Sequence, residues 1–544
     1  MNTRQLQTDK NQKLYHALLG ILLVCALAMM MLLSYWACKY SYYGAVDGRT
    51  RGVLVGDKTW AHIAVFLAAS LCTMGIDKVL MKKDKSQQEK ICLCTLIVTS
   101  VIAFILGVFY VCKNPYYPVG DQINTTAFAA YCRDGNFSML SIGGYVGMYQ
   151  QQKGLAILYE ILFTLFGDFN YRPAKILHVV WWILTILAGY GFLKLNTDRP
   201  VFRMLYCVMM LGCFPLLFYL PYIYGDVLSI SFGIILFYGV VAYEHSGQKR
   251  YIALASFAAG LAVLARKNTW IVLVAVAVYV LLVSLRKKKV RYLMAGTAIL
   301  LTAALSVKAV DVIYEVRSGY PSGVGVPSIL WVAMGLQETE GRAGVYNRYQ
   351  QATFTDYDCQ QELAAQQGKE YIRERLEEFS QDPGMAFDFF KNKLEGQWIE
   401  PMYAALESTE SFEEGAELSP VLESLYYGEL GRTIWKLTNY YQSILYLAGL
   451  MALVMLGILW WKKKEVPISL WLPWIAVFGG FLFSILWEAK SRYVFPYCVF
   501  MILYAPEGLY QTGLLLCKLP KLRKFKKSGH TQDKGEEASL RETA

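Results

Sequence analysis

The sequence is poor in residues that build metal centres. Only five of its 544 residues are histidine, and no two of them are spaced like metal ligands on one helix face. The twelve cysteines include no pair at zinc spacing, and most lie in apolar runs, where small buried hydrophobes are expected. Cys112 and Cys132 flank one predicted loop, so a disulfide between them stays open. The sequence also lacks a Walker loop and a GxGxxG motif in a βαβ unit, which argues against a soluble nucleotide-binding domain.

Charge is also scarce. Charged residues make up 17% of the chain, hydrophobic residues make up 55%, and the mean hydropathy is +0.32. These values are typical of a protein embedded in a bilayer. The net charge is +11, but Lys and Arg fall mostly in short clusters between apolar stretches, such as KKDKSQQEK, RKKKVR and KLPKLRKFKK. Such clusters indicate cytoplasmic membrane anchors, and no nucleic-acid partner is expected.

Apolar runs long enough to cross about 30 Å of hydrocarbon predict an all-α, polytopic membrane helix bundle of about twelve spans. The expected spans are 15–36, 60–81, 91–111, 174–194, 201–219, 223–243, 251–266, 269–285, 292–312, 437–461, 468–488 and 493–514. The pair 251–266 and 269–285 is short and meets at a polar break, which fits either two shortened spans or a re-entrant pair.

Twelve spans place every basic segment on one side, which the positive-inside rule assigns to the cytoplasm. These segments are 1–13, 82–90, 194–203, 244–250, 286–291, 461–465 and 517–527. The run 154–169 is interpreted as a helix at the outer interface, because a further span would turn RKKKVR outward. We therefore expect a multi-pass plasma-membrane protein with cytoplasmic termini.

The chain divides into five parts by this topology. We expect an N-terminal two-span extension (1–90), a core (91–312) whose first outer loop is 112–153, a mainly helical extracytoplasmic domain (313–436), a three-span bundle (437–516) and a basic cytoplasmic tail (517–544). The large domain contains two helix-like runs, EYIRERLEEFSQ and GMAFDFFKNKLEGQWIE, separated at Asp382-Pro383.

Several charged residues are predicted to gather at the outer ends of the spans. They are Asp121, Lys175, Asp226, Arg266, Lys267, Glu488 and Arg492. A charge at the bilayer centre costs roughly 2.5–3.5 kcal/mol on insertion scales and less near the interface, so each one alone is tolerable. Each also has an ordinary structural interpretation: Asp121 and Asp226 as helix caps, Glu488 with Arg492 as an i,i+4 ion pair. Lys308 and Asp311 look like a similar i,i+3 pair.

Together these groups fit the transfer of a sugar from a lipid-phosphate carrier. Nucleotide sugars are cytosolic, so transfer on the outer face needs a donor held in the membrane. A carboxylate takes the proton of the acceptor hydroxyl, and cations neutralise the charge that develops on the leaving phosphate. Arg forks and Lys point charges suit the second task.

Five segments carry a family resemblance: YYPVGDQ, LYEILFTLFGDFNYRPAKILHVVWW, GLAVLARKNTWIVLVAVAVY, PSILWVAMGLQ and WEAKSRYVFPY. Over roughly residues 90–500 the chain resembles the GT-C superfamily of polytopic glycosyltransferases. The resemblance is to bacterial relatives of dolichyl-phosphate-mannose–protein mannosyltransferases and of lipid A aminoarabinose transferases. It implies that Asp121 is the catalytic base and that Arg266, Lys267 and Arg492 bind the lipid phosphate.

The remaining candidates, Glu488, Asp226 and Lys175, are expected to bind the lipid phosphate or the sugar. The implied partners are a polyprenyl-phosphate sugar donor, a glycan, lipid or protein acceptor, and membrane lipid. Many family members carry two adjacent acids in the first loop, whereas Gln122 follows Asp121 here. No cofactor is therefore assigned, and a divalent metal stays open.

Two other functions compete with this one. Enzymes similar to O-antigen ligases and polymerases share the outline but generally use a histidine in the large late loop, and residues 313–436 contain none. A lipid-linked-sugar flippase or secondary transporter should show paired broken helices in two halves and ionisable residues near mid-membrane, which this sequence does not indicate.

Overall fold

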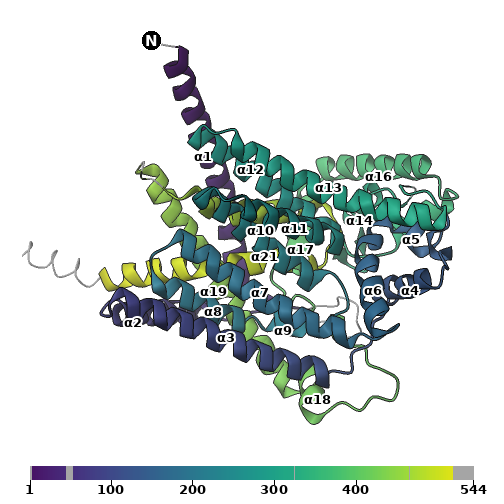
Figure 1. Ribbon diagram of the computed structural model, residues 1–544, viewed down its shortest axis with the longest axis horizontal. Coiled ribbons are helices and arrows are strands. Elements are labelled where there is room, and N and C mark those ends of the chain that lie inside the picture. The colour runs from purple at the N-terminus through teal and green to yellow at the C-terminus, as the bar shows by residue number, and fades with distance from the viewer. Residues whose placement is uncertain (1–2, 44–52, 324, 463, 465, 519–544) are drawn as a thin grey trace, which may run out of the picture.

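The computed structural model describes residues 3–43, 53–323, 325–462, 464 and 466–518. The described residues form an all-α helix bundle (Figure 1). Their strands make only two short hairpins, β1 (Tyr40–Tyr43) with β2 (Val53–Gly56) and β3 (Glu338–Thr339) with β4 (Arg342–Ala343). The predicted fold class, a polytopic membrane helix bundle, is confirmed. The predicted tail lies outside the described residues from 519 onward.

Nine helices in the described part of the chain are long and apolar enough to cross a membrane. They are α1 (Thr3–Lys39), α2 (Thr59–Leu80), α3 (Lys85–Lys113), α7 (Arg172–Asn196), α10 (Asp226–Ser246), α12 (Trp270–Lys287) with the 3-10 turn Lys267–Thr269 before it, α13 (Arg291–Ser318), α19 (Glu429–Trp461) and α20 (Leu472–Leu486) with the 3-10 turn Ile468–Trp471 before it. Each of these helices covers one of the expected apolar runs.

The other three expected spans form shorter or interrupted helices. The run 201–219 becomes α8 (Pro200–Leu211) and α9 (Phe214–Phe218), which begins with a proline at its second position. The run 493–514 becomes α21 (Ser491–Met501), a turn at 502–504 and a second helix over 505–518. The run 251–266 is α11 (Lys249–Ala265), which has 17 residues because Arg266 adopts an extended backbone. It still crosses the bundle, since it starts beside the end of α10 and Arg266 returns to the start of α10.

The bundle has two chemically distinct ends. At one end, ion pairs join the basic segments: Arg203 with Glu89 (2.6 Å), Arg199 with Asp77 (3.1 Å) and Lys287 with Glu244 (2.9 Å). Figure 1 shows this end at the left, with the α2–α3 corner, and the opposite end at the right, with α4, α5 and α6. The described basic segments therefore share one end, and their cytoplasmic orientation stays a prediction.

Short helices cover the opposite end. They are α4 (Asp121–Arg133), α5 (Tyr145–Met148) and α6 (Lys153–Phe166). The 14 residues of α6 are too few to span the hydrocarbon, and the helix packs on α4, α11 and α13. Cys132 of α4 is buried and Cys112 is exposed on α3, and both are free thiols, so the disulfide that the sequence left open is absent between these two described residues.

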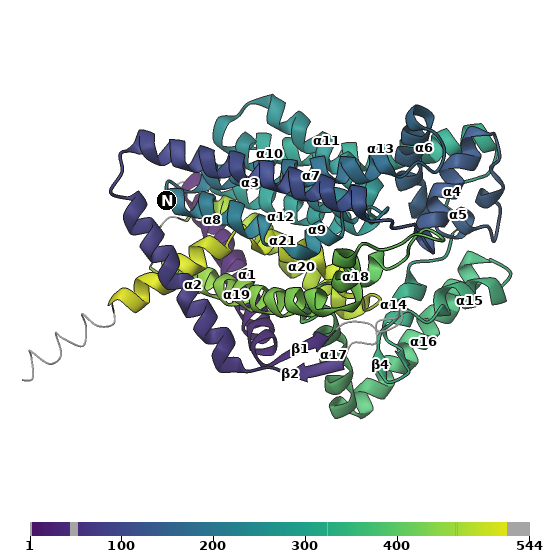
Figure 2. The ribbon, with the colours of Figure 1, turned by 90° about the horizontal axis from the view of Figure 1, so that it is seen from below.

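The predicted large domain contains α14 (Ile329–Gly335), α15 (Tyr349–Asp356), α16 (Gln361–Gln381), α17 (Pro383–Trp398) and α18 (Pro420–Tyr427). It lies beside the covered end of the bundle (Figure 2). The two helices expected around Asp382 are present, and its side chain caps α17 by accepting the Met385 N–H at 2.9 Å. The flanking spans reach further than expected, because α13 continues to Ser318 and α19 begins at Glu429.

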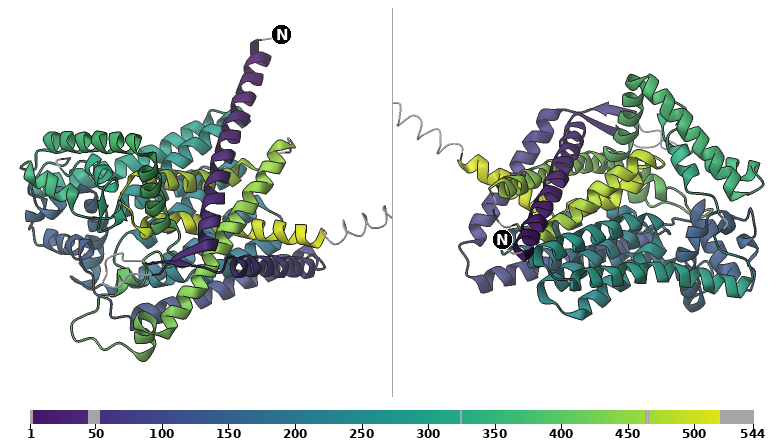
Figure 3. Two further views of the ribbon diagram at one scale, coloured as in Figure 1. Left: turned by 180° about the vertical axis from the view of Figure 1, so that it is seen from behind. Right: turned by 90° about the horizontal axis from the view of Figure 1, so that it is seen from above.

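The N-terminal segment is an integral part of the bundle. Helix α1 packs along α19, and α2 packs on α19 and α8. Figure 3 shows α1 beside these C-terminal helices, with its N-terminal end projecting beyond the rest. The β1–β2 hairpin, which the sequence did not predict, lies between α1 and α2 in the chain. On this hairpin the Tyr42 N–H donates to the Ile399 carbonyl at 3.1 Å.

Candidate functional site

A buried carboxylate and two guanidinium groups meet at the covered end of the bundle. Arg266 lies 3.0 Å from Asp226, and the Nε of Arg492 lies 3.8 Å from the other oxygen of the same carboxylate. Asp226 is 3% exposed and Arg492 is 6% exposed. Asp226 is the first residue of α10, Arg266 directly follows α11, and Arg492 is the second residue of α21. Three separate helices therefore build this cluster, here called the arginine pair site.

A glycine permits this approach. Gly225 precedes α10, and a Cβ at this position would lie 2.0 Å from the Ala265 carbonyl oxygen. Any larger residue would have to separate the start of α10 from the end of α11. The Gly225-Asp226 sequence therefore brings the carboxylate against Arg266.

Tyrosine rings surround the two guanidinium groups. The Arg266 guanidinium lies 4.9 Å from the ring centre of Tyr224 and 5.5 Å from that of Tyr493. The Arg492 guanidinium lies 5.2 to 5.6 Å from the rings of Tyr222, Tyr224 and Tyr493 and donates to the Tyr222 hydroxyl. These cation–π contacts hold the cations in place without neutralising them.

The hydrogen-bonding capacity of the two arginines is not fully used within the site. Two arginines share the Asp226 carboxylate, and the buried Nε of Arg492 has no hydrogen-bond partner in the described structure. The other nearby acid, Glu488, follows the end of α20 and accepts from the Tyr493 hydroxyl at 3.2 Å. Burial raises the pKa of Glu488, while the charge of Lys490 lowers it. An anion with several oxygens would complete this site.

Asp121 borders the arginine pair site. It is the first residue of α4, it is exposed, and its carboxylate accepts from the Tyr145 hydroxyl at 2.8 Å. Burial first, and Asp121 second, raise the pKa of Tyr145, so this hydroxyl keeps its proton and donates it to the bond. Asp121 also contributes to the raised pKa of Glu488, which places the two carboxylates in one electrostatic environment.

A chain of contacts connects Asp121 to Arg266. The Thr125 hydroxyl donates to the Asp121 carbonyl at 2.7 Å and to the Gln152 side-chain oxygen at 3.3 Å. The Gln152 amide then donates to the Tyr224 hydroxyl at 2.6 Å, and the Tyr224 ring lies against Arg266. The structure brings Asp226, Arg266 and Arg492 into direct contact, while Glu488 reaches this group through Tyr493 and Asp121 reaches it through Gln152 and Tyr224.

Two predicted site residues contact other parts of the structure. Lys175 is buried, and its ammonium donates to the carbonyl oxygen of Tyr116 at 2.8 Å, so it holds the segment that leads to Asp121. Lys267 is exposed and lines a separate cavity, although Arg266 precedes it directly. The sequence could not separate these roles, because neighbouring side chains at a turn point in different directions.

The ordinary structural interpretations also need correction. Glu488 and Arg492 do not form the expected i,i+4 pair, because α21 begins only at Ser491 and Arg492 turns to Asp226. The residues that cap α4 and α10 are glycines, and Asp121 and Asp226 are the first helical residues.

The ion pair expected between Lys308 and Asp311 is also absent from the described contacts. Asp311 instead pairs with Lys153 at 2.5 Å, and Lys308 lies 4.0 Å from Glu315.

Two cavities flank the site. The first, here the α11–α13 cavity, has a volume of about 280 Å³. Its walls are amphipathic: the apolar side chains are Val263, Leu264, Trp270, Val307 and Val310, and the polar ones include Gln150, Lys153, Lys267 and Ser328. The second, here the α17 cavity, has a volume of about 230 Å³ and reaches the site through Lys490 and Ser491.

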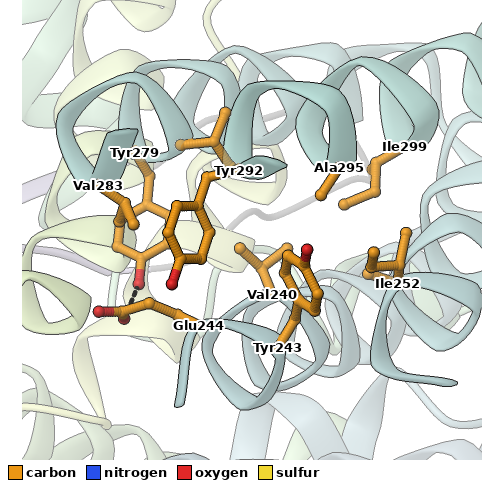
Figure 4. Close-up of a pocket in the computed structure, with 11 residues that line it drawn as sticks. Val240, Tyr243, Glu244, Ile252, Tyr279, Val283, Tyr292, Ala295 and Ile299 are labelled. Atoms are coloured by element: carbon orange, nitrogen blue, oxygen red, sulfur yellow. Dashed lines mark hydrogen bonds between the residues drawn. The ribbon is translucent and has the colours of Figure 1, made fainter. Parts of the chain in front are cut away.

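A third pocket lies at the opposite, basic end (Figure 4). Its volume of about 10 Å³ is no more than the roughly 10–15 Å³ that one water needs. Its carboxylate, Glu244, accepts from the Tyr279 hydroxyl at 2.5 Å and pairs with Lys287. This pocket is a packing feature in which the buried charge already has its partners.

The described residues contain no group of three or more His, Cys, Asp or Glu side chains placed to hold a metal ion. Sequence reasoning missed the tyrosines at 145, 222, 224 and 493, because Tyr near span ends is an ordinary interface feature. For Tyr222, Tyr224 and Tyr493 the available signal was their position beside charged residues, in PYIYGD and KSRY, whereas Tyr145 in GGYVGM had no such signal.

No protein-family model matches the chain, and no curated protein matches it significantly in sequence.

Proposed function

We propose that this protein is a membrane glycosyltransferase that moves a sugar from a polyprenyl-phosphate carrier to an acceptor hydroxyl at the outer membrane surface. One observation carries the proposal. Two arginines, one buried and one half-buried, share a single buried carboxylate at the end of the spans, and a second acid, Asp121, lies at the edge of the same site. A phosphate would accept hydrogen bonds from the two arginines, and Asp121 would take the proton of the acceptor hydroxyl.

The lipid part of the donor would enter by the α11–α13 cavity. Its apolar wall suits a hydrocarbon chain, and Lys267 stands on its polar side. The phosphate would then lie between Lys267 and the two arginines. Arginine presents a fork of donors to phosphate oxygens, while lysine acts as a point charge, so the three cations have complementary tasks.

The reaction follows from these positions. The acceptor oxygen forms a bond to the anomeric carbon, and the bond from that carbon to the phosphate oxygen breaks. The acceptor proton passes to the Asp121 carboxylate, and the polyprenyl phosphate leaves with both bonding electrons. Fixed cations that meet the growing phosphate charge lower the barrier, because they need no reorganisation during the reaction. Tyr145 holds Asp121 by a hydrogen bond from the side, which fixes the carboxylate for the approaching hydroxyl.

The test uses the full chain in lipid nanodiscs. Undecaprenyl phosphate that carries a linked, radiolabelled mannose, glucose, galactose, N-acetylglucosamine or arabinose is supplied as the donor, one sugar at a time. The release of undecaprenyl phosphate is then measured. We expect turnover of at least one donor, lost in Asp121→Asn. Movement of an intact lipid-linked sugar between leaflets without cleavage would instead identify a flippase, and no binding of undecaprenyl phosphate would exclude both functions.

A further inference from the structure

The α17 cavity is a second enclosed space beside the arginine pair site. Five segments line it: the β1 strand, the β4 region, α17, the turn after α17 and residues 489–491. Its volume of about 230 Å³ is far above the roughly 10–15 Å³ that a water needs, so it can hold a small organic molecule. No residue lines both this cavity and the α11–α13 cavity.

Its position connects it to the reaction site. The turn 488–492 carries Glu488 and Arg492 of the site and Lys490 and Ser491 of the cavity wall. The Ala489 N–H donates to the Gly344 carbonyl at 2.7 Å, which holds this turn against the large domain. A ligand in the α17 cavity would therefore contact the same turn that carries Glu488 and Arg492 of the arginine pair site.

The wall is largely polar, with several glycines and alanines among its longer side chains. Asn392, Gln397 and Ser491 provide hydrogen-bonding groups, and the Gln397 side-chain oxygen is buried without a partner in the described structure. Gly341, Gly396 and the alanines at 343, 404 and 489 leave the space open. The largest aliphatic side chain is Val345, so the lining does not suit a hydrocarbon chain.

The two most deeply buried ionisable groups of the wall are close to neutral. Burial lowers the pKa of Lys393 to about 7, and its amine donates to the Gly335 carbonyl. Burial, followed by the charge of Glu407, raises the pKa of Glu400 to about 8, and its carboxyl accepts N–H groups of Met402 and Ala404. The deeper part of the wall therefore suits an uncharged, hydroxyl-rich ligand better than an ion, and the charged residues Arg342, Glu407 and Lys490 line the rest of the cavity.

Tyr42 supplies the one aromatic surface among the lining residues. It lies on β1, and its backbone N–H is held by the carbonyl of Ile399, directly after α17. A flat ring beside several hydrogen-bonding groups matches a sugar, which presents C–H groups on one face and hydroxyls at its edge. The N-terminal segment thereby acquires a task, since it contributes this ring to a site built by residues 341–491.

We infer that the α17 cavity is the acceptor subsite and that the acceptor is a neutral saccharide, with Asn392, Gln397 and Tyr42 as its binding residues. The assignment of this saccharide as the acceptor rests on the proposed function. The saccharide site itself stands on the cavity and its lining. A sugar held there would direct a hydroxyl past Ser491 toward Asp121 and the anomeric carbon.

A matched pair of variants tests this inference. Val345 and Val307 are both half-buried valines, one lining each cavity. In nanodiscs, binding of methyl glycosides of glucose, galactose, mannose and N-acetylglucosamine is measured by saturation-transfer NMR, and binding of undecaprenyl phosphate is measured separately. We expect Val345→Trp to reduce the methyl glycoside signal at least fivefold and to leave undecaprenyl phosphate binding unchanged, with the reverse result for Val307→Trp.

Asn392→Leu removes one hydrogen-bonding group without filling the cavity, and it should weaken methyl glycoside binding even if Val345→Trp fails to fold. The inference is overturned if no methyl glycoside binds, if Asn392→Leu and Val345→Trp leave the signal intact, or if a serine- and threonine-containing peptide competes for the cavity. If the wild type binds methyl glycosides but does not bind undecaprenyl phosphate, the proposed function is excluded and the saccharide site is retained.

Discussion

The Arg266 guanidinium lies 3.0 Å from the Asp226 carboxylate, although 40 residues separate them in sequence. Their contact joins the start of α10 to the residue that follows α11 and leaves Arg492 as a second cation on the same carboxylate at 3.8 Å. Two guanidinium groups share one contacting carboxylate, the buried Nε of Arg492 has no hydrogen-bond partner in the described structure, and isolated buried charge is costly. The unused hydrogen-bonding capacity of these two arginines is the basis for expecting a phosphate ligand.

Arg492→Lys should weaken binding of undecaprenyl phosphate. The substitution keeps the charge but loses the planar fork and its contact with Tyr222, so we expect about a tenfold rise in Kd, equivalent to about 1.4 kcal/mol. Kd is measured by microscale thermophoresis in nanodiscs. Arg432→Lys is the matched control, because Arg432 pairs only with Glu429 on an exposed part of α19. Equal affinity in Arg492→Lys and the control would contradict phosphate binding by Arg492.

Asp121→Asn should abolish sugar transfer and leave undecaprenyl phosphate binding within about twofold of wild type. The amide keeps the size of the side chain but cannot take a proton, and general bases contribute on the order of 10²–10⁴-fold to rate. Asp134→Asn changes an acid at the other end of the same helix, α4, and should retain full activity. A fully active Asp121→Asn enzyme would mean that another group is the base.

The sequence predicted the membrane-spanning helices, and it selected Asp226, Arg266 and Arg492, which the structure places in contact. Apolar runs are long, and charge at their ends is rare, so Asp121, Asp226, Arg266 and Arg492 could be selected without coordinates. The directions of Lys175 and Lys267 could not be predicted, because they depend on local backbone geometry. The tyrosines were missed for a different reason: membrane proteins place many aromatics at this depth, so each ring alone carries little information.

The N-terminal hairpin and the α17 cavity show another limit of sequence reasoning. Tyr42 meets residues near 400 only because α1 and α2 pack along α19. Residues 313–436 were expected to form a separate helical domain. The sequence offered no sign that the α17 cavity, which this domain lines, would also be lined by the turn 488–492. Such contacts between distant segments follow from tertiary packing and not from local patterns.

Glu400→Gln should flatten the pH dependence of thermal stability between about pH 4.5 and 8. The folded pKa of Glu400 is raised from 4.5 to about 8, so the folded state holds this proton more tightly than the unfolded state does. The resulting stability is fully present below pH 4.5 and is lost as the pH rises through about 8. Differential scanning fluorimetry at several pH values measures the slope of Tm against pH for both proteins.

Lys393→Met provides the opposite sign. The folded pKa of Lys393 falls from 10.5 to about 7, so its contribution to stability is present above pH 10.5 and is lost as the pH falls through about 7. The methionine variant should lose that dependence while keeping the one caused by Glu400. If neither substitution changes the slope of Tm against pH, these two groups are not buried as the structure places them.

Cysteine labelling should place residue 362 and residue 289 on opposite sides of the membrane. Glu362 lies on α16 of the large domain and Lys289 lies at the basic end, between α12 and α13, and both are exposed. Single cysteines at these positions in a cysteine-free background are treated in intact cells with an impermeant maleimide. We expect labelling at position 362 only, and labelling of both after permeabilisation. Labelling of position 289 alone in intact cells would reverse the topology.

Gly225→Ala should separate the arginine pair site from its carboxylate. The added Cβ would lie 2.0 Å from the Ala265 carbonyl oxygen, which is backbone and cannot rotate away, so the start of α10 must move from the end of α11. The Asp226–Arg266 pair breaks, and leaving buried charges uncompensated costs on the order of 3–5 kcal/mol. We expect a lower Tm and loss of undecaprenyl phosphate binding, measured by scanning fluorimetry and thermophoresis. Gly75→Ala on α2 is the matched control, since nothing lies within 4 Å of its added Cβ, and it should keep both properties. A stable Gly225→Ala protein with normal phosphate binding would show that the close approach of α10 and α11 does not position the site.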